Sequence, residues 1–245
     1  MIYSFCKKAY GKLLIILLKI LKINIMNSTK IVVPAKGNSL RLPKKNLKKF
    51  GSFPLLHWTL EPLIKSQIGE IIVSSESSEV LDYASNYNVK IHRRPANLSL
   101  PNVHSSMVVL DVARKICSSD DYIGVALPTV PFRKKNTLKS IKETFLKDIK
   151  RSLISIASMR ISKNHILFKN NGGYNRLNDK INFQDNDSPE VFAFSGYLQL
   201  AKLKDFDKKK SFHLINPNYF EVPFDEALDI NTLNDFKFAQ RMIGN

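Results

Sequence analysis

The sequence is poor in cysteine and has no apolar run of membrane-spanning length near its N-terminus. Its two cysteines, Cys6 and Cys117, lie far apart, which excludes a disulfide framework and indicates a reducing, cytoplasmic compartment. The apolar run Leu13–Leu18 is followed by Lys19 and Lys22, whereas a membrane span needs about 20 apolar residues. This run is also short for a signal peptide, and no small-residue cleavage site follows it.

Acidic residues are absent from the first 25 positions, where five lysines occur: Lys7, Lys8, Lys12, Lys19 and Lys22. The whole chain of 245 residues carries a formal charge of +17, which favours anionic ligands, nucleic acid or acidic membranes without distinguishing them. We interpret residues 1–25 as an extension, with two alternatives. Translation starts naturally at Met26, or the extension is a basic amphipathic helix that rests on a membrane or a partner. Residues 26–245 are expected to form the main domain.

The familiar glycine-rich phosphate signatures are missing as well. Ile31–Pro34 is predicted to be a short buried strand, and the loop after it contains one glycine, Gly37, whose backbone can adopt angles closed to other residues. No glycine precedes a Lys-Ser or Lys-Thr pair here, which excludes a Walker A loop. A lone glycine likewise excludes a dinucleotide fingerprint.

The same loop is strongly basic. Lys36, Arg41, Lys44 and Lys45 concentrate positive charge after the predicted strand, and ligands of open α/β sheets bind at that end of the strands. Backbone amides together with lysine and arginine suit a polyphosphate, because both offer donors to anionic oxygens. Charge alone favours a solvated loop, and the order strand, loop, helix narrows the difference between that interpretation and a binding role.

Strand-like and helix-like segments alternate over most of the chain. The predicted strands are Ile31–Pro34, Glu70–Ser74, Val89–His92, Tyr122–Leu127, Ser152–Ser158, Val191–Leu200 and Glu221–Pro223, and the predicted helices are Pro54–Gln67 (broken at Pro62), Ser77–Tyr87, Val103–Cys117, Leu138–Leu146 and Thr232–Ile243. This alternation predicts an α/β fold with a doubly wound, mostly parallel sheet. The Asn-rich segment Asn164–Pro189 is predicted to be a flexible excursion or a hairpin insertion.

Five motifs resemble those of the CMP-sugar synthetases, the cytidylyltransferases that activate sialic-acid-like and ketodeoxyoctulosonate sugars. They are the loop residues Lys36, Ser39, Arg41, Pro43 and Lys45, the segment Arg94–Leu98 followed by Ser105 and Ser106, the loop Leu127–Arg133, the pair Ser195 and Gly196, and the turn Asp225–Thr232. They occur in the family's order from about Ile31 to the C-terminus. The resemblance implies a nucleotide-diphospho-sugar transferase-like fold with a small insertion around residues 160–190, and a homodimer.

The resemblance also implies a reaction and a site. The expected activity is transfer of CMP from CTP to an acidic, nonulosonate-type sugar with release of pyrophosphate, aided by Mg²⁺, in the synthesis of cell-surface polysaccharide. The implied catalytic residues are Lys36, Arg41, Lys45 and Asp229, the implied substrate-binding residues are Gly37, Ser39, Asn46, Arg94, Thr129, Arg133, Ser195 and Gly196, and the implied metal ligands are Asp229 and Asn231. On the residues alone, Asp229 is as well suited to capping the last helix.

Several positions depart from the family pattern. Asn231 stands in place of the second acid of the metal turn. Lys36 and Ala193 each stand where the family has an arginine, Leu127 where it has a glutamine, and Ser195 where it has an asparagine. Asparagine lacks the charge that makes a carboxylate the stronger ligand of magnesium. A catalytically weakened or inactive homologue that acts as a nucleotide-binding or scaffold protein is therefore one alternative. A nucleic-acid-binding protein is another, but no aromatic-basic binding signature accompanies the cations, so we expect no nucleic acid partner.

Overall fold

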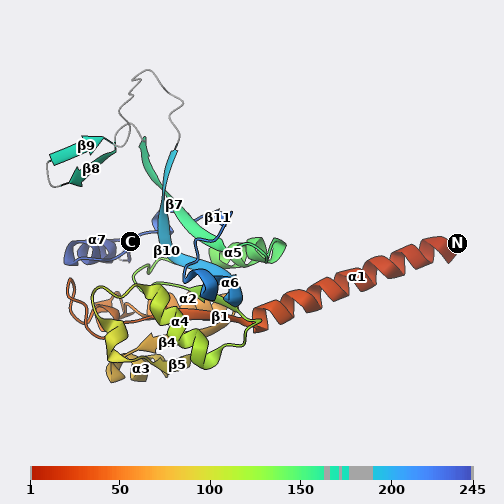
Figure 1. Ribbon diagram of the computed structural model, residues 1–245, viewed down its shortest axis with the longest axis horizontal. Coiled ribbons are helices and arrows are strands. Elements are labelled where there is room, and N and C mark those ends of the chain that lie inside the picture. Colours follow the sequence, from red (N-terminus) through yellow and green to blue (C-terminus); the bar gives the residue numbers. More distant parts are fainter. Residues whose placement is uncertain (1, 163–165, 171–172, 177–189, 244–245) are drawn as a thin grey trace, which may run out of the picture.

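A seven-stranded sheet forms the centre of the molecule (Figure 1). The computed structural model describes residues 2–162, 166–170, 173–176 and 190–243, and its sheet has the order β11-β7-β10-β6-β1-β4-β5. The strands are β1 (Thr29–Pro34), β4 (Glu70–Ser75), β5 (Lys90–Arg93), β6 (Tyr122–Val125), β7 (Leu153–Ser162), β10 (Glu190–Lys202) and β11 (Asn218–Glu221). Of these seven, β10 alone runs antiparallel to its neighbours. The predicted mostly parallel sheet is confirmed.

Helices cover both faces of this sheet. The helices α2 (His57–Ser66), α3 (Ser78–Ala84) and α5 (Lys135–Lys147) contribute to one apolar cluster, and α4 (Ser105–Ile116) and α6 (Leu203–Lys209) contribute to another. Within β1, Ile31 and Val33 face the first cluster and Val32 faces the second. All three side chains are fully buried, as expected of a strand covered on both sides. The doubly wound arrangement follows from this two-sided burial.

Local signals explain most element boundaries, with one exception. The hydroxyl of Ser77 accepts a hydrogen bond from the backbone of Val80 and caps α3 as predicted. Helix α2, by contrast, continues through Pro62, so the predicted break there is wrong. A proline removes one backbone donor, and Pro62 is buried, so packing of the helix outweighs the loss. Helix α6 was not predicted from the sequence.

A third apolar cluster joins the two ends of the main domain. It consists of Leu42, Phe50, Leu55, Ile230, Phe236 and Ala239, which come from the basic loop, from the hairpin β2 (Lys49–Phe50) and β3 (Phe53–Pro54), and from the last helix α7 (Leu233–Ile243) with the turn before it. The ring of Phe50 lies 5.4 Å from that of Phe236 and 6.0 Å from that of Phe132. This cluster, called the Phe50 cluster below, fixes α7 against the segment that follows the basic loop.

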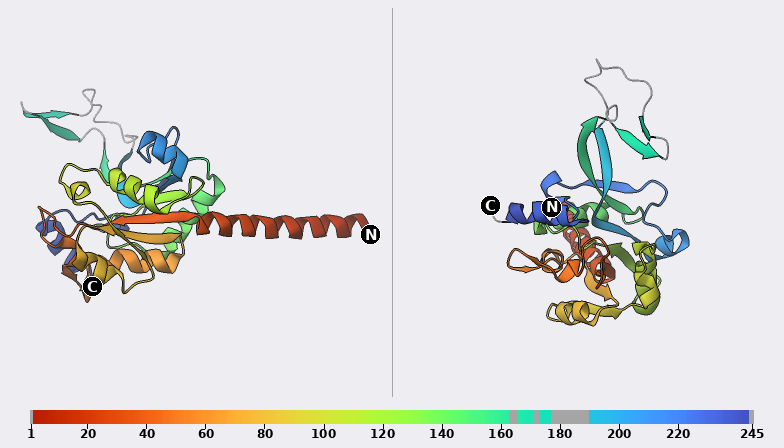
Figure 2. Two further views of the ribbon diagram at one scale, coloured as in Figure 1. Left: turned by 60° about the horizontal axis from the view of Figure 1, so that its bottom comes forward. Right: turned by 90° about the vertical axis from the view of Figure 1, so that its left-hand side faces the viewer.

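Two parts of the chain project from the main domain (Figure 2). Strands β7 and β10 extend beyond the sheet as an arm that carries the hairpin β8 (Leu167–Asn170) and β9 (Gly173–Arg176). The hairpin alternative for the insertion is confirmed for these residues, and residues 177–189 lie outside the described part. On the other side, helix α1 (Ile2–Asn27) leaves the domain. In the described part of the chain, none of the helices has the length and apolarity needed to cross a membrane.

The central place of Phe50 leads to a test. Phe50→Ala should lower the free energy of unfolding by about 3–5 kcal/mol, because it leaves a cavity between α7 and the β2–β3 hairpin. Phe238→Ala is the matched control, since this α7 side chain is 57% exposed, and it should change stability by less than about 0.5 kcal/mol. Urea unfolding measures both. Equal effects of the two substitutions would contradict the role assigned to the Phe50 cluster.

Candidate active site

The basic loop meets the turn before α7 at the carboxyl ends of the parallel strands. The Lys45 ammonium donates to the backbone carbonyl of Ile230 at 2.8 Å, and the Arg41 guanidinium donates to the side-chain oxygen of Asn231 at 2.8 Å. The backbone of Ile230 in turn donates to the carbonyl of Thr129 at 2.8 Å. The structure therefore brings together predicted site residues that are up to 190 positions apart in the sequence.

The first half of the loop is held by hydrogen bonds and by close packing. The Asn46 amide donates to the carbonyl of Lys36 at 2.7 Å, and Ser39 is half-buried in the same loop. Gly37 does not use the backbone freedom available to glycine, because its φ is not positive. A Cβ at this position would collide with Ser77. Glycine is thus required because the loop touches the start of α3.

Glu76 organises this part of the site and was not predicted. Its carboxylate accepts hydrogen bonds from the Gly37 backbone at 2.9 Å, from Ser99 at 2.7 Å and from the Arg94 guanidinium at 2.7 and 3.1 Å. Burial alone would raise the pKa of Glu76, but these bonds outweigh it and lower the pKa to about 2. Arg94 is buried and holds Glu76. It therefore positions the loop, and its contact with a nucleotide stays a prediction.

Two lysines of the site carry charge in a poorly solvated place. Burial lowers the pKa of Lys45, Asp229 opposes this shift, and Arg41 adds to it. Burial and Arg94 lower the pKa of Lys36 in the same way. A lowered lysine pKa means that the charged form is under-compensated. Binding of an anion between these side chains would relieve that imbalance, so the site is prepared for a polyanionic ligand.

Asp229 does not cap the last helix. Thr232 and Asp235 perform that role, because the Asp235 backbone donates to the Thr232 hydroxyl at 3.2 Å and the Thr232 backbone donates to the Asp235 carboxylate at 2.7 Å. This is a reciprocal capping box. The Asp229 carboxylate instead accepts the Asn231 amide on one oxygen, at 2.7 Å. Its other oxygen, Oδ1, is buried and has no hydrogen-bond partner among the described residues.

The donor set at this turn fits a magnesium ion bound mainly through a substrate. The unpartnered Oδ1 of Asp229 is an available hard ligand, whereas the carbonyl oxygen of Asn231 is engaged by Arg41. The described residues contain no group of three or more His, Cys, Asp or Glu side chains suited to a metal. Magnesium commonly takes one or two protein carboxylates and completes its shell with phosphate oxygens and water. Asp229 is the residue that could hold it.

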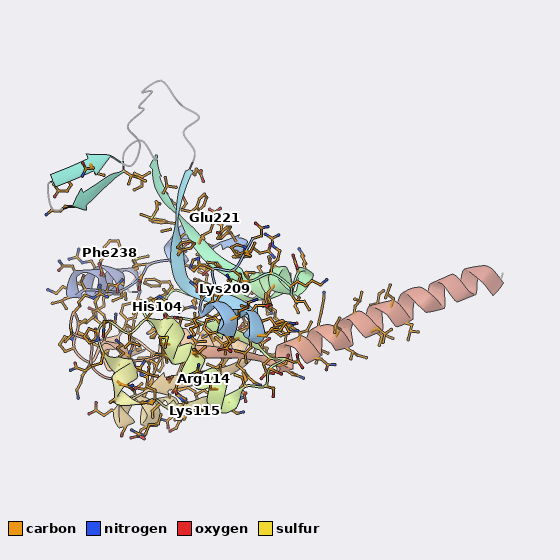
Figure 3. All side chains as sticks on the ribbon, in the orientation of Figure 1. His104, Arg114, Lys115, Lys209, Glu221 and Phe238 are labelled. Carbon is orange, nitrogen blue, oxygen red and sulfur yellow. The ribbon has the colours of Figure 1, made fainter. Side chains whose placement is uncertain are left out.

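A cavity of about 450 Å³ opens beside Asp229. Ser195 and Gly196 line it, together with polar side chains that were not among the predicted site residues, including His104, Gln199 and His213. His104 lies at the start of α4 (Figure 3). The spacing of these three residues in the sequence carries no signal, because the fold alone brings them together. Their mixed donors and acceptors suit a hydroxylated, acidic molecule.

Strand β10 shapes the wall of this cavity. Its pairing register with β7 shifts between Phe194 and Gln199, and such irregularities re-aim side chains near binding sites. The Ser195 hydroxyl accepts a bond from the Tyr197 backbone at 3.2 Å. A Cβ at Gly196 would come within 2.7 Å of the Leu127 side chain. The small residue therefore lets β10 approach the loop that follows β6.

Arg133 has a structural role in place of the predicted sugar contact. Its buried guanidinium uses all five of its N–H donors on protein groups: the carbonyls of Leu127, Val130, Gly196 and Tyr197, and the hydroxyl of Thr59. Burial lowers its pKa to about 10, although Tyr197 and Asp229 oppose the shift. No donor of Arg133 is left for a substrate. The residue fastens the loop after β6 to strand β10.

This assignment predicts that Arg133→Lys acts on stability and not on sugar affinity. A lysine offers three donors, so at least two buried acceptors would lose their partner, at a cost of about 1–3 kcal/mol each. We expect the free energy of unfolding to fall by at least about 2 kcal/mol in urea titrations. If the folded variant keeps its stability but has a strongly raised KM for the sugar, the predicted contact between Arg133 and the sugar would be correct after all.

Two curated relatives of the chain are named as a cytidylyltransferase and a CMP-diacetyllegionaminic acid synthase. It is 26% identical over 216 residues to pseudaminic acid cytidylyltransferase of Campylobacter jejuni subsp. jejuni serotype O:23/36, covering 85% of this chain and 93% of that protein. It is also 26% identical over 229 residues to CMP-N,N'-diacetyllegionaminic acid synthase of Legionella pneumophila, covering 86% of this chain and 94% of that protein.

Solved structures and a family profile agree with these relatives. The structure of CMP:2-keto-3-deoxy-manno-octonic acid synthetase complexed with CTP matches with a TM-score of 0.63 at 13% identity, covering 88% of this chain and 98% of that chain. The 4-diphosphocytidyl-2C-methyl-D-erythritol synthase of Anaerococcus prevotii matches with a TM-score of 0.63 at 12% identity, covering 89% and 99%. These likenesses show the fold. The profile of the family described as Cytidylyltransferase matches residues 30–221, and the chain therefore belongs to the cytidylyltransferase family.

Proposed function

We propose that the protein transfers CMP from CTP to an acidic, nonulosonate-type sugar and releases pyrophosphate. One observation carries the proposal: the basic loop is bonded to the Asp229–Asn231 turn, beside a polar cavity. The relatives named for pseudaminic and legionaminic acid support the choice of sugar class. The arrangement offers a cationic place for a triphosphate next to a place for its acceptor.

The residues of the loop would act mainly by position and charge. In the reaction, the anomeric hydroxyl of the sugar attacks the α-phosphorus, the bond to the β-phosphate oxygen breaks, and pyrophosphate leaves. Such transfers depend on alignment and on neutralising the phosphate oxygens. Lys36, Arg41 and Lys45 supply three cations there, and each of the two lysines keeps N–H donors beyond the bond it already makes.

Magnesium fits this scheme at Asp229. When bound, the ion would supply positive charge that neutralises part of the negative charge of the triphosphate. The carboxylate of Asp229 presents its unpartnered oxygen for this purpose. Asn231 assists by donating its amide to the other oxygen, which fixes the carboxylate's orientation. The departure from a second acid therefore changes the charge of the turn but keeps its geometry, and this favours an active enzyme over a scaffold.

The cavity would hold the sugar. Asp229 borders it, so an acceptor lying there would have its reacting hydroxyl near the place proposed for the triphosphate. His104, Gln199 and His213 offer hydrogen bonds to the hydroxyl, acyl and carboxylate groups of such a sugar. Nearby Phe194, whose ring lies 4.3 Å from that of His213, adds an apolar surface for the substituents of a modified nonulosonate.

We also propose that the protein is a homodimer of the cytoplasm. The β7–β10 arm exposes four large apolar side chains, Met159, Ile161, Phe192 and Phe194. A group of this kind on a projecting element is typical of an interaction surface, and a second copy supported by the family resemblance would cover it. The cytoplasm provides CTP, and the free thiol of Cys117 suits its reducing conditions.

The reaction can be tested directly. Purified protein with CTP, Mg²⁺ and a panel of nonulosonates should release pyrophosphate, chelation of the metal should abolish release, and Asp229→Asn should lower kcat by about 100-fold or more. Asp225→Asn is the matched control, because Asp225 is exposed and pairs with Lys134; it should keep activity within about threefold. Intact CTP binding without pyrophosphate release from any sugar would favour the inactive-homologue alternative.

The unusual Asn231 supplies a second test. Asn231→Asp should increase the apparent magnesium affinity by roughly tenfold, since it adds a carboxylate beside Asp229. Without the metal, the same change should reduce stability, because two carboxylates would face each other across the former 2.7 Å hydrogen bond. Asn234→Asp adds the same charge at an exposed position of α7 and is the control. The dependence of the reaction rate on magnesium concentration measures the effect. Identical curves for the unaltered protein and the two variants would show that the ion does not bind at this turn.

A further inference from the structure

The middle of helix α1 is an apolar rod that the other residues described by the structure leave uncovered. The 26 residues of the whole helix span about 39 Å, and its last turn inserts Ile25 and Met26 into the core. Before that turn, nine leucine and isoleucine side chains are each 48–58% exposed: Leu13, Leu14, Ile15, Ile16, Leu17, Leu18, Ile20, Leu21 and Ile23. Figure 3 shows these turns standing clear of the domain. Water is a poor environment for so much contiguous apolar surface.

The same helix has positive charge and no negative charge. Residues 1–60 contain no aspartate or glutamate. In the sequence Lys8, Lys12, Lys19 and Lys22 recur at helical spacing, which places these positions along one side. Lys19 and Lys22 are exposed in the structure. The helix thus combines an apolar flank with a basic one, and its partner needs both apolar surface and anionic groups.

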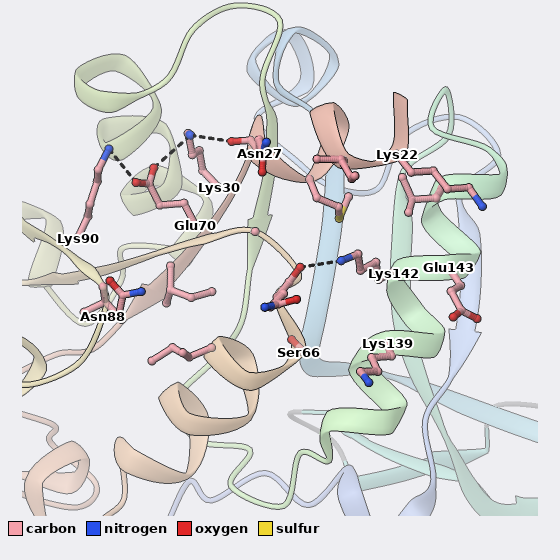
Figure 4. A pocket seen from close by; sticks show the side chains of 18 residues that line it. Lys22, Asn27, Lys30, Ser66, Glu70, Asn88, Lys90, Lys139, Lys142 and Glu143 are labelled. Carbon is pink, nitrogen blue, oxygen red and sulfur yellow. Dashed lines mark hydrogen bonds and ion pairs between the residues drawn. The ribbon is translucent and has the colours of Figure 1, made fainter. Parts of the chain in front are cut away.

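The basic side continues onto the domain at the base of α1. A hollow of about 1130 Å³ lies there (Figure 4), and Lys22, Lys30, Lys90, Lys139 and Lys142 line it. Two carboxylates offset part of this charge: Glu70 pairs with Lys30 and Lys90 at 3.1 and 2.9 Å, and Glu143 also lines the hollow. The remaining lysines leave an excess of positive charge at the amino-terminal edge of the parallel strands.

We propose that α1 and this basic edge together dock the enzyme on an anionic lipid bilayer. The apolar flank of α1 enters the surface obliquely, and the lysines of the helix and of the hollow lie against the lipid headgroups. Helices with apolar and lysine-rich sides bind membrane interfaces in this manner without spanning them. The candidate active site lies at the opposite edge of the sheet, and therefore stays open to water and to soluble substrates.

The observations favour a bilayer over a second copy of α1. The apolar side chains of residues 13–23 cover most of the helix circumference outside the side that carries the lysines, whereas a coiled-coil partner covers a narrow stripe. A second α1 would also bring further lysines and no countercharge. A bilayer with anionic lipids satisfies the apolar and the charged requirement together. The proposal does not depend on the reaction proposed above.

Vesicle binding by the full-length protein tests the proposal. The protein should partition onto vesicles of 70% phosphatidylcholine and 30% phosphatidylglycerol at least tenfold more strongly than onto phosphatidylcholine alone, and added salt should weaken the binding. Leu17→Asp should reduce partitioning at least tenfold. Its control, Ile215→Asp, changes a residue that is 83% exposed elsewhere on the surface, and should leave partitioning unchanged.

A charge pair tests the domain's share of the surface. The double variant Lys139→Glu with Lys142→Glu should reduce partitioning by at least about fivefold, whereas Lys237→Glu with Arg241→Glu, on α7, should have no effect. Thermal unfolding checks that each variant is folded. Absent or lipid-independent binding would overturn the proposal. Light scattering that shows an oligomer for the unaltered protein and its loss in Leu17→Asp would also overturn the proposal, because a second copy of the chain would then cover the helix.

Discussion

The contact between the basic loop and the turn before α7 is the constraint on which the site depends. Neither segment is part of the central sheet, so strand pairing does not hold them together. The Phe50 cluster does so, because Phe50 lies between the hairpin after the loop and Phe236 of α7. Once these apolar groups are packed, Lys45 reaches the carbonyl of Ile230. The cations of the basic loop and the carboxylate of Asp229 thereby lie in one site, although they come from opposite ends of the domain's sequence.

Burial gives that place its electrostatic character. Lys45 is 7% exposed and Arg133 is 5% exposed, and both are held by backbone carbonyls in preference to carboxylates. Carbonyl dipoles stabilise a buried cation without cancelling its net charge. Glu76 shows the opposite arrangement, because the guanidinium of Arg94 neutralises the charge of its carboxylate. The domain therefore keeps its free positive charge where a triphosphate would lie, and neutralises charge where the scaffold must be rigid.

The sheet could be predicted from the sequence because apolar runs such as Ile31–Pro34 and the capping serine Ser77 act locally. The meeting of Arg41 with Asn231 was expected only through the family resemblance, since no local pattern links positions so far apart. The structural roles of Arg94 and Arg133 were not predicted, because the residue type shows charge but not whether neighbouring carbonyls and carboxylates already use its donors. His104, Gln199 and His213 were missed for a related reason: each is unremarkable until folding brings the loops around one cavity.

The single antiparallel strand has a mechanical consequence. β10 belongs both to the projecting arm and to the cavity wall, and its register with β7 shifts between Phe194 and Gln199, where Ser195 and Gly196 border the cavity. A strand is stiff along its length, so a load applied at the tip of the arm is transmitted to this irregular point, where the ladder yields most easily. The arm and the cavity wall are thus one continuous piece of backbone, so a force on one acts on the other.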